Sequence, residues 1–282
     1  MKKVLLLTNG PQAPDGKFTE MFKAITEASG QFELEVSHDR NRLADASMFD
    51  AVALYIVGGS ITPEQERGLT AFVRNGGGLL AVHGSNAGLG KYDAYIELIG
   101  TEFIGHDPLA PFEVTTEDGV DDILPRLNKR FRVVDECYKL KPRTDAPLRY
   151  FQYGTWRLER YPLGYVRDYG DGRVFYTALG HDDRTFRQPD FQDQLIKGLR
   201  YVTGLKDNSP IRIGLVGYGP LFGMGKHHAG MISQTRGFEL VAVCDRDTER
   251  LRVAKAEQGE QIATFTDVQE LASSGLIDLG IV

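Results

Sequence analysis

The sequence predicts an α/β protein made of two units, each built around a parallel sheet. Apolar strands and amphipathic helices alternate from the first residues onward, which is typical of a parallel sheet covered by helices on both faces. A polar segment at residues 206–210 follows a glycine and ends in proline, which marks a boundary. An apolar strand then starts a second series of strands and helices. We therefore divide the chain into residues 1–205, a linker at 206–210 and residues 211–282.

Composition and charge exclude several classes of protein. The 282 residues include 33 lysines and arginines against 39 aspartates and glutamates, and the net charge of −6 argues against a nucleic-acid-binding protein with a basic surface. The longest apolar run, Ala51–Val57, is far shorter than the roughly 20 residues of a membrane-spanning helix. The apolar stretch after Met1 is too short for a signal peptide, and the two cysteines do not form a disulfide framework. We expect a cytoplasmic protein without membrane contact.

Hydrophobic periodicity predicts the first four elements. Lys3–Leu7 is apolar enough for a buried strand, and Lys17–Ser29 has apolar residues at helical spacing. Phe32–Val36 alternates apolar and polar residues, as a strand with one solvated face does. Ala51–Val57 is continuously apolar, which is typical of a strand covered on both faces. The predicted order is therefore strand, helix, strand and strand.

A capping motif predicts the next helix. Thr62 stands at the N-cap position, Pro63 opens the first turn, and Gln65 follows the cap by three residues. The helix ends at the glycines of residues 76–78, and Leu79–Val82 is the next buried strand. Because ligands of such sheets bind beyond the carboxyl ends of the strands, the residues that follow the strands are the first candidates for function.

The second half of residues 1–205 is less regular. Tyr165–Tyr169 and Arg173–Leu179 flank the Gly-Asp-Gly turn of residues 170–172, which predicts a β-hairpin. Pro189–Val202 has its apolar residues on one helical stripe. The second strand of the hairpin leads directly to His181, so we expect this histidine at a strand end.

Four side chains are candidates for chemistry: His83, His106, Glu136 and His181. His83 lies between a buried strand and Gly84, where a sharp turn exposes a side chain at the top of the sheet. His181 precedes carboxylates that can orient its imidazole. His106 lies in a predicted loop, and Glu136 follows an apolar stretch. Together the four side chains would form an acid–base cluster or a metal site. Their spacing along the sequence does not distinguish these two possibilities.

Each candidate also has a simpler interpretation without chemistry. His83 would then be a hydrogen-bonded histidine at a strand end. His106 and His181 would be solvated loop residues, and Glu136 would belong to a solvated strand end.

Several motifs resemble those of the trehalose-utilization ThuA-like family. In chain order they are the glycine-rich turn, strand and histidine at residues 76–83, Gly-His-Asp at 105–107, Asp-Glu-Cys-Tyr at 135–138, and the strand with Gly-His-Asp at 172–182. The resemblance covers about residues 1–205. It implies a flavodoxin-like fold related to class I glutamine amidotransferases. It also implies a role in sugar catabolism, commonly beside the oxidation of disaccharides to keto-sugars.

The relation to amidotransferases argues against glutaminase activity. Their nucleophile is a cysteine at a turn after a strand, and a histidine on a later strand activates it. Here the turn position is His83, and His181 takes the place of the activating histidine. Cys137 and Cys244 lie elsewhere, whereas a thiolate mechanism needs its sulfur within hydrogen-bond reach of a base. We expect no glutaminase activity.

Residues 211–282 begin with a strand that runs into a glycine-rich loop. Gly217 and Gly219 follow the strand Ile211–Val216 and permit a tight turn close to a pyrophosphate, which would lie at the helix N-terminus. The dinucleotide-binding fingerprint has a third glycine where this chain has Phe222. The next glycine is Gly223, so the loop is longer than the standard one.

This strand, loop, helix and strand resemble the N-terminal part of the Gfo/Idh/MocA oxidoreductases. The resemblance implies binding of NAD or NADP and oxidation of a sugar or polyol. Asp245 follows the second strand, where a carboxylate would bind the ribose hydroxyls and favour NAD, while the adjacent Arg246 leaves NADP open. The catalytic lysine motif of that family would come after Ile277–Val282. We therefore expect this chain to be part of a longer fusion and to bind nucleotide weakly or not at all by itself.

Two functions are open for residues 1–205. In the first, the unit is an enzyme that processes a sugar or keto-sugar, with His83 and His181 as acid–base groups and with Glu136 and His106 as orienting or substrate-binding groups. A variant of it binds a divalent metal through His83, His106 and His181 or a subset of them. In the second, the unit binds a sugar or a partner without chemistry. A homo-oligomer is compatible with either function. A pocket that holds the four side chains within mutual reach would favour the enzyme.

Overall fold

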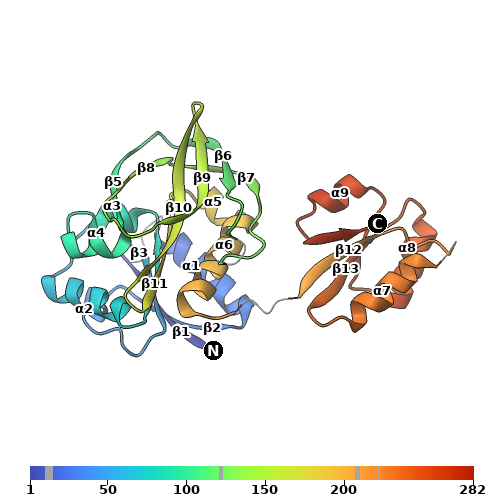
Figure 1. Ribbon diagram of the computed structural model, residues 1–282, viewed down its shortest axis with the longest axis horizontal. Coiled ribbons are helices and arrows are strands. Elements are labelled where there is room, and N and C mark those ends of the chain that lie inside the picture. The colour runs from blue at the N-terminus through green and yellow to red at the C-terminus, as the bar shows by residue number, and fades with distance from the viewer. Residues whose placement is uncertain (10–14, 121–122, 207–209, 221–222) are drawn as a thin grey trace. The chain divides into compact units, whose positions relative to one another are not determined.

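The computed structural model describes residues 1–9, 15–120, 123–206, 210–220 and 223–282. The chain forms two compact units, Met1–Asp207 and Asn208–Val282 (Figure 1). Of the predicted linker, residues 207–209 lie outside the described residues. Within the described ranges, no helix combines the length and the apolar character needed to span a membrane.

Among the described residues of the first unit, nine strands form one mixed sheet in the order β2-β1-β3-β4-β11-β10-β9-β6-β7. The first five of them are parallel neighbours, which confirms the predicted α/β class. They are β2 (Phe32–Ser37), β1 (Lys2–Thr8), β3 (Ala51–Tyr55), β4 (Gly78–Val82) and β11 (Gly172–Thr177). Every residue of β3 and β4 is buried, as their continuous apolar sequences predict.

Four antiparallel strands extend this sheet beyond β11. They are β10 (Glu159–Tyr169), β9 (Arg149–Trp156), β6 (Ala110–Thr116) and β7 (Arg130–Asp135). The predicted hairpin of β10 and β11 is present. However, β10 starts earlier than predicted because its first half pairs with β9, and β11 ends at Thr177 rather than Leu179.

A separate pair of antiparallel strands corrects one prediction. β5 (Thr101–His106) pairs with β8 (Tyr138–Pro142), and His106 lies opposite Tyr138. The prediction that His106 lies in a loop is therefore wrong, because it is the last residue of a strand. The partner strand lies more than 30 residues further along the chain, so local patterning did not reveal the pairing.

Helices cover both faces of the parallel strands (Figure 1). α6 (Pro189–Thr203) packs on β4 and β11, and its neighbour α1 (Asp15–Ser29) packs on β1 and β2. α2 (Pro63–Arg74) also packs on β4 and β11, and α4 (Asp93–Ile99) packs against α2 and β11. The capping box predicted at Thr62 is present in α2. The shorter helices of this unit are η1 (Arg40–Leu43), α3 (Gly84–Leu89) and α5 (Asp183–Phe186).

The second unit has a parallel sheet in the order β14-β13-β12-β15 over its described residues. Its elements are β12 (Ile211–Val216), α7 (Met224–Gln234), β13 (Phe238–Cys244), α8 (Thr248–Gln258), β14 (Ala263–Phe265), α9 (Val268–Ser273) and β15 (Leu279–Ile281). This arrangement confirms that the second series of strands and helices is built around a parallel sheet, as predicted.

Candidate functional site

The backbone of His83 turns sharply where β4 ends. Its φ of 47° and ψ of −113° lie in a region that residues other than glycine rarely adopt. Backbone strain of this kind costs about 1–3 kcal/mol. The backbone N–H of His83 donates to the carbonyl oxygen of Thr177 at 2.7 Å, which ties the turn to the end of β11. Gly84 leaves room for the turn, because a Cβ atom there would lie 2.6 Å from Cγ2 of Val57. The predicted sharp turn is therefore present, but the expectation that it exposes the side chain is wrong, because the imidazole of His83 is buried.

The imidazole of His83 is held in one tautomer. Its Nδ1 lies 2.8 Å from the carbonyl oxygen of Ala178, and since that oxygen only accepts, Nδ1 carries the proton. Nε2 is therefore a lone-pair acceptor, and the hydroxyl of Tyr138 donates to it at 3.1 Å. Burial lowers the pKa of His83 to about 4, because the side chain is only 1% exposed. The ring is thus neutral at physiological pH.

All four predicted side chains meet beyond the ends of β4 and β11. Nδ1 of His181 lies 3.3 Å from Nε2 of His83 and 3.3 Å from Oε2 of Glu136. Nε2 of His83 is 3.7 Å from the same carboxylate oxygen. The other oxygen of Glu136 lies 3.5 Å from Nδ1 of His106. We call these four residues the histidine–glutamate cluster.

The cluster has a buried side and a side open to solvent. His83 is buried and Glu136 is 13% exposed, whereas the side chains of His106 and His181 are 42% and 41% exposed. The simpler interpretation of Glu136 as a solvated strand end is therefore wrong, since its carboxylate lies among the histidines. A molecule from solvent would reach the cluster from the side of His106 and His181.

Asp135 fixes the positions of the cluster residues and is a residue that the sequence analysis missed. Its buried carboxylate accepts hydrogen bonds from the backbone N–H groups of Glu136, Gly180 and His181 at 2.8–3.1 Å. Burial is the largest influence on this carboxyl group and raises its pKa. The period-two pattern of buried Phe131, Val133 and Asp135 was the available signal, because it puts the aspartate on the inner face of β7.

Tyr138 is the second residue that the sequence analysis did not single out. Its ring centroid lies 4.5 Å from that of His83, and its side chain is almost fully buried. Burial raises the pKa of its hydroxyl, so Tyr138 remains a hydrogen-bond donor to Nε2 of His83. The cluster therefore includes a neutral donor beside its histidines and its carboxylate.

The cysteines do not lie at a catalytic turn. His83 occupies the turn after β4, and Cys137 is buried between β7 and β8. Burial raises the pKa of the Cys137 thiol to about 12, which leaves almost no thiolate near neutral pH. Cys244 is also free and buried, at the end of β13.

The glycine-rich loop of the second unit leads from β12 to α7. Gly217 has a φ of 91° and Gly223 has a φ of 60°, and a Cβ atom at either position would have no heavy atom within 4 Å. Gly225, which the sequence analysis did not choose, is the tightly packed glycine, since a Cβ atom there would lie 2.4 Å from the carbonyl oxygen of Gly217. Phe222, the departure from the fingerprint, lies outside the described residues.

The carboxylate of Asp245 faces this loop. It accepts hydrogen bonds from the backbone N–H groups of Tyr218 at 2.8 Å and Asp247 at 3.0 Å. Arg250 lies 3.7 Å away, and Gly219 packs against the same guanidinium group. Arg246 is exposed. The predicted loop and carboxylate are thus adjacent, as a nucleotide site of this type needs.

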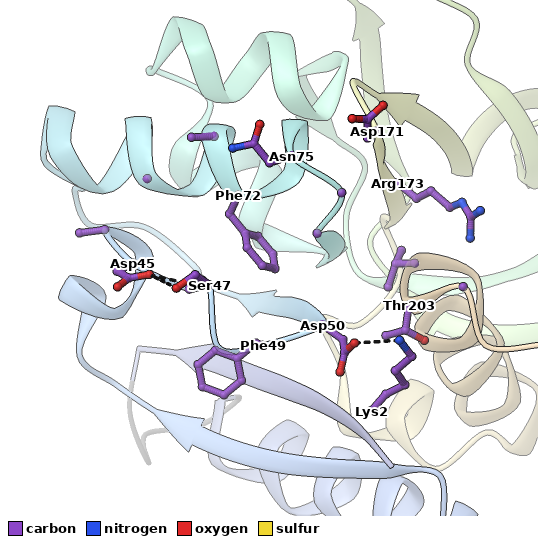
Figure 2. Close-up of a pocket in the computed structure, with 18 residues that line it drawn as sticks. Lys2, Asp45, Ser47, Phe49, Asp50, Phe72, Asn75, Asp171, Arg173 and Thr203 are labelled. Atoms are coloured by element: carbon purple, nitrogen blue, oxygen red, sulfur yellow. Dashed lines mark hydrogen bonds and ion pairs between the residues drawn. The ribbon is translucent and has the colours of Figure 1, made fainter.

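A pocket on the first unit lies at the other ends of the parallel strands (Figure 2). Lys2, Asp50 and Arg173 line it, and these residues are at the beginnings of β1, β3 and β11. Nζ of Lys2 lies 2.8 Å from a carboxylate oxygen of Asp50. The residues of the histidine–glutamate cluster do not line this pocket.

Comparisons with known proteins agree with the two units. Residues 3–202 match the ThuA family model, described as trehalose utilisation. Residues 211–282 match the model of the Gfo/Idh/MocA oxidoreductase family, described as an NAD-binding Rossmann fold. No curated protein matches the chain significantly.

Solved structures with the fold of the first unit come from several bacteria. A ThuA-like protein from Parabacteroides merdae is 21% identical with a TM-score of 0.63, and the match covers 72% of this chain and 90% of that one. A ThuA-like protein from Bacteroides uniformis is 16% identical with a TM-score of 0.59, covering 71% and 91%. A protein of Salmonella typhimurium described as cytoplasmic is 13% identical with a TM-score of 0.51, covering 72% and 98%. Since the family model spans most of the sequence, the chain belongs to the ThuA family of trehalose utilisation.

Proposed function

We propose that the first unit is an enzyme that acts on a sugar or keto-sugar at the histidine–glutamate cluster. One observation carries the proposal: His83, Glu136 and His181 bring a nitrogen, an oxygen and a nitrogen within 3.3–3.7 Å of one another beyond the strand ends. Grouped imidazoles and a carboxylate are suited to general acid–base catalysis. The family description supports a carbohydrate as the substrate.

The reaction we propose is proton transfer next to the carbonyl group of a keto-sugar. The C–H bond beside the carbonyl breaks, and its proton goes to an imidazole nitrogen. The electron pair of that bond forms a carbon–carbon double bond, while the carbonyl oxygen takes a proton from a second group of the cluster. The product is an enediol, and reversal of the step on the other carbon moves the carbonyl group.

The surroundings suggest a role for each side chain. His83 and His181 are the acid–base pair, because their facing nitrogens can pass a proton between them. His181 is partly exposed and can exchange that proton with solvent. Glu136 lies against both rings and would orient them, and His106 at the open side would bind the substrate.

Exchange of carbon-bound hydrogen with solvent tests this function. The full chain would be incubated in D₂O with keto-glycosides and with their parent disaccharides, including trehalose, and followed by NMR. We expect deuterium next to the carbonyl of a keto-sugar, and a loss of about 100-fold or more in His181→Gln. His38→Gln is the matched control, since His38 follows β2 and hydrogen-bonds Thr8. Equal rates in wild type and His181→Gln would contradict the proposal.

A binding module without chemistry is the second candidate. The observation in its favour is the imidazole of His83 at the turn where the related amidotransferases have their nucleophilic cysteine. Saturation-transfer NMR with the same sugars separates the two candidates. Binding without deuterium exchange across the whole panel would favour the module.

We further propose that the second unit binds NAD or NADP weakly, at its glycine-rich loop. Gly217, Gly219 and Gly223 would receive the pyrophosphate, and Asp245 would bind the ribose, with Arg246 beside it. The family match of residues 211–282 supports this assignment. Calorimetry with both nucleotides at high protein concentration tests it: we expect weak binding, with NAD binding more tightly than NADP, and Gly217→Val to weaken both. Unchanged binding in that variant would contradict the assignment.

A further inference from the structure

We propose that His83, Glu136 and His181 bind one divalent metal ion of the zinc type through Nε2, Oε2 and Nδ1. The inference uses the same cluster as the proposed function and adds a cofactor to it. It does not depend on the identity of the sugar, because the ion would bind in the absence of substrate. Among the described residues, these three side chains form a group whose ligand atoms are close enough for a shared ion.

The distances between the three atoms fit a single ion. They are 3.3 Å, 3.3 Å and 3.7 Å, and a circle through three points with these separations has a radius of about 2.0 Å. Zinc binds histidine nitrogen at about 2.0–2.1 Å and carboxylate oxygen at about 2.0–2.2 Å. An ion slightly outside the plane of the three atoms would therefore reach all of them without rearrangement of the backbone.

The chemistry of the donors also fits. Nδ1 of His83 donates to the carbonyl oxygen of Ala178, and this hydrogen bond leaves the Nε2 lone pair directed at the cluster. Metal-binding histidines are usually held in this way by a backbone carbonyl or a carboxylate. Two imidazoles and one carboxylate suit zinc or a similar transition metal rather than calcium or magnesium, which prefer oxygen ligands alone. Three protein ligands leave a fourth position open, as in catalytic zinc sites.

The fold holds these ligands in place before an ion binds. The three residues follow β4, β7 and β11, which are far apart in the sequence. Asp135 joins two of these strand ends, because its carboxylate accepts from the backbone of Glu136 on one side and of Gly180 and His181 on the other. The third ligand is tied to β11 by the hydrogen bonds of its own backbone and ring. A rigid arrangement of this kind lowers the cost of binding an ion.

Tyr138 and His106 are the remaining polar groups at this place. The hydroxyl of Tyr138 donates to Nε2 of His83. This hydrogen bond would have to break before the Nε2 lone pair could bind the ion. His106 touches the other oxygen of Glu136 and is exposed, so it stays available to the substrate. An ion held there would take the lone pairs of His83 and His181, so these two would serve as ligands instead of as the acid–base pair proposed for the metal-free cluster, and His106 would be the remaining imidazole for proton transfer to the sugar.

Metal titration of the full chain tests the inference. The protein would be prepared without a histidine tag, freed of metal by a chelator, and titrated with Zn²⁺ and with Co²⁺, whose absorption spectrum reports the number of ligands. We expect one ion per chain with a tetrahedral Co²⁺ spectrum, and a loss of affinity of about 100-fold in both His181→Gln and Glu136→Gln. His38→Gln should bind like the wild type. Tyr138→Phe should bind at least as tightly, because it lacks the competing hydroxyl.

Two results would overturn the inference. One is the absence of stoichiometric binding by a wild-type chain whose fold is intact by the fluorescence of its single tryptophan, Trp156. The other is binding that His181→Gln and Glu136→Gln leave unchanged. The deuterium exchange assay tests the proposed function separately from metal binding. Exchange that persists with a chelator present would leave the sugar chemistry in place without the metal.

Discussion

The two edges of the parallel sheet in the first unit use charged groups in opposite ways. Beyond the ends of β4 and β11, three histidines and a glutamate crowd together, and one of the histidines is buried on a strained backbone. At the beginnings of the strands, Lys2 and Asp50 form an ion pair at 2.8 Å, with about a third of each side chain exposed. The first arrangement withdraws His83 and Glu136 from water and leaves His106 and His181 at the surface, whereas both members of the ion pair remain partly exposed.

The two sets of residues differ in how much they affect the stability of the fold. A partly exposed ion pair at the surface, such as that of Lys2 and Asp50, contributes about 0–1 kcal/mol and tolerates change. A buried histidine and a buried aspartate cost free energy unless every polar atom has a partner. His83 and Asp135 do have partners, which are backbone groups on neighbouring segments. We therefore expect substitutions where the strands end to lower the free energy of unfolding more than substitutions where the strands begin.

The largest effect is expected for Asp135→Ala. The change leaves three buried or partly buried backbone N–H groups without their acceptor, and each such loss costs about 1–3 kcal/mol. We expect the free energy of unfolding of the first unit to fall by roughly 4 kcal/mol, together with loss of any activity of the cluster. Urea unfolding followed by Trp156 fluorescence measures it, since the only tryptophan lies in this unit. A loss below 1 kcal/mol would mean that Asp135 does not hold the strand ends together.

The second prediction concerns pH. Burial lowers the pKa of His83 to about 4, whereas an unfolded histidine titrates near 6.5. Between these values the unfolded chain binds a proton that the folded chain does not, so the free energy of unfolding falls as the pH falls from about 6.5 to about 4. The shift corresponds to on the order of 3 kcal/mol, and this contribution is constant above pH 6.5.

The measurement compares metal-free wild type with His83→Asn by urea unfolding across this pH range, with a chelator present. Other groups titrate in both proteins, so the difference between the two curves isolates His83. Parallel curves would show that His83 is not held neutral in the folded protein.

The third prediction uses the thiols. Because burial raises the pKa of Cys137 to about 12, alkylation of the native protein by iodoacetamide at pH 8 should be at least about 100-fold slower than that of the urea-unfolded chain. Cys137→Ser leaves only the buried Cys244 and serves as the reference. Rapid reaction of the native Cys137 would indicate a thiol more accessible than its burial implies and would reopen the question of a nucleophilic cysteine.

The smallest effect is expected at the opposite edge. Asp50→Asn removes the charge that pairs with Lys2 and keeps a side chain of the same shape. We expect the free energy of unfolding to fall by less than about 1 kcal/mol, with unchanged metal binding and unchanged deuterium exchange. A loss comparable to that of Asp135→Ala would remove the contrast between the two edges.

Local patterning predicted most of the elements on which the cluster is built. Hydrophobic runs placed β1, β3 and β4, and the Thr62 motif placed the start of α2. The positions of His83 and His181 after buried strands followed from the same runs. The four antiparallel strands beyond β11 could not be predicted as a continuation of the sheet, because short alternating segments do not specify their partners.

The α/β class, the division into two units and the residues that end the parallel strands could be predicted from the sequence, since they depend on periodicity and on glycine and proline. Three features became visible only in the folded chain: Glu136 lies 3.3 Å from His181, His106 belongs to a strand opposite Tyr138, and Asp135 is buried. These contacts join segments separated by tens of residues. Their physical origin is the pairing of distant strands, which local propensity does not encode.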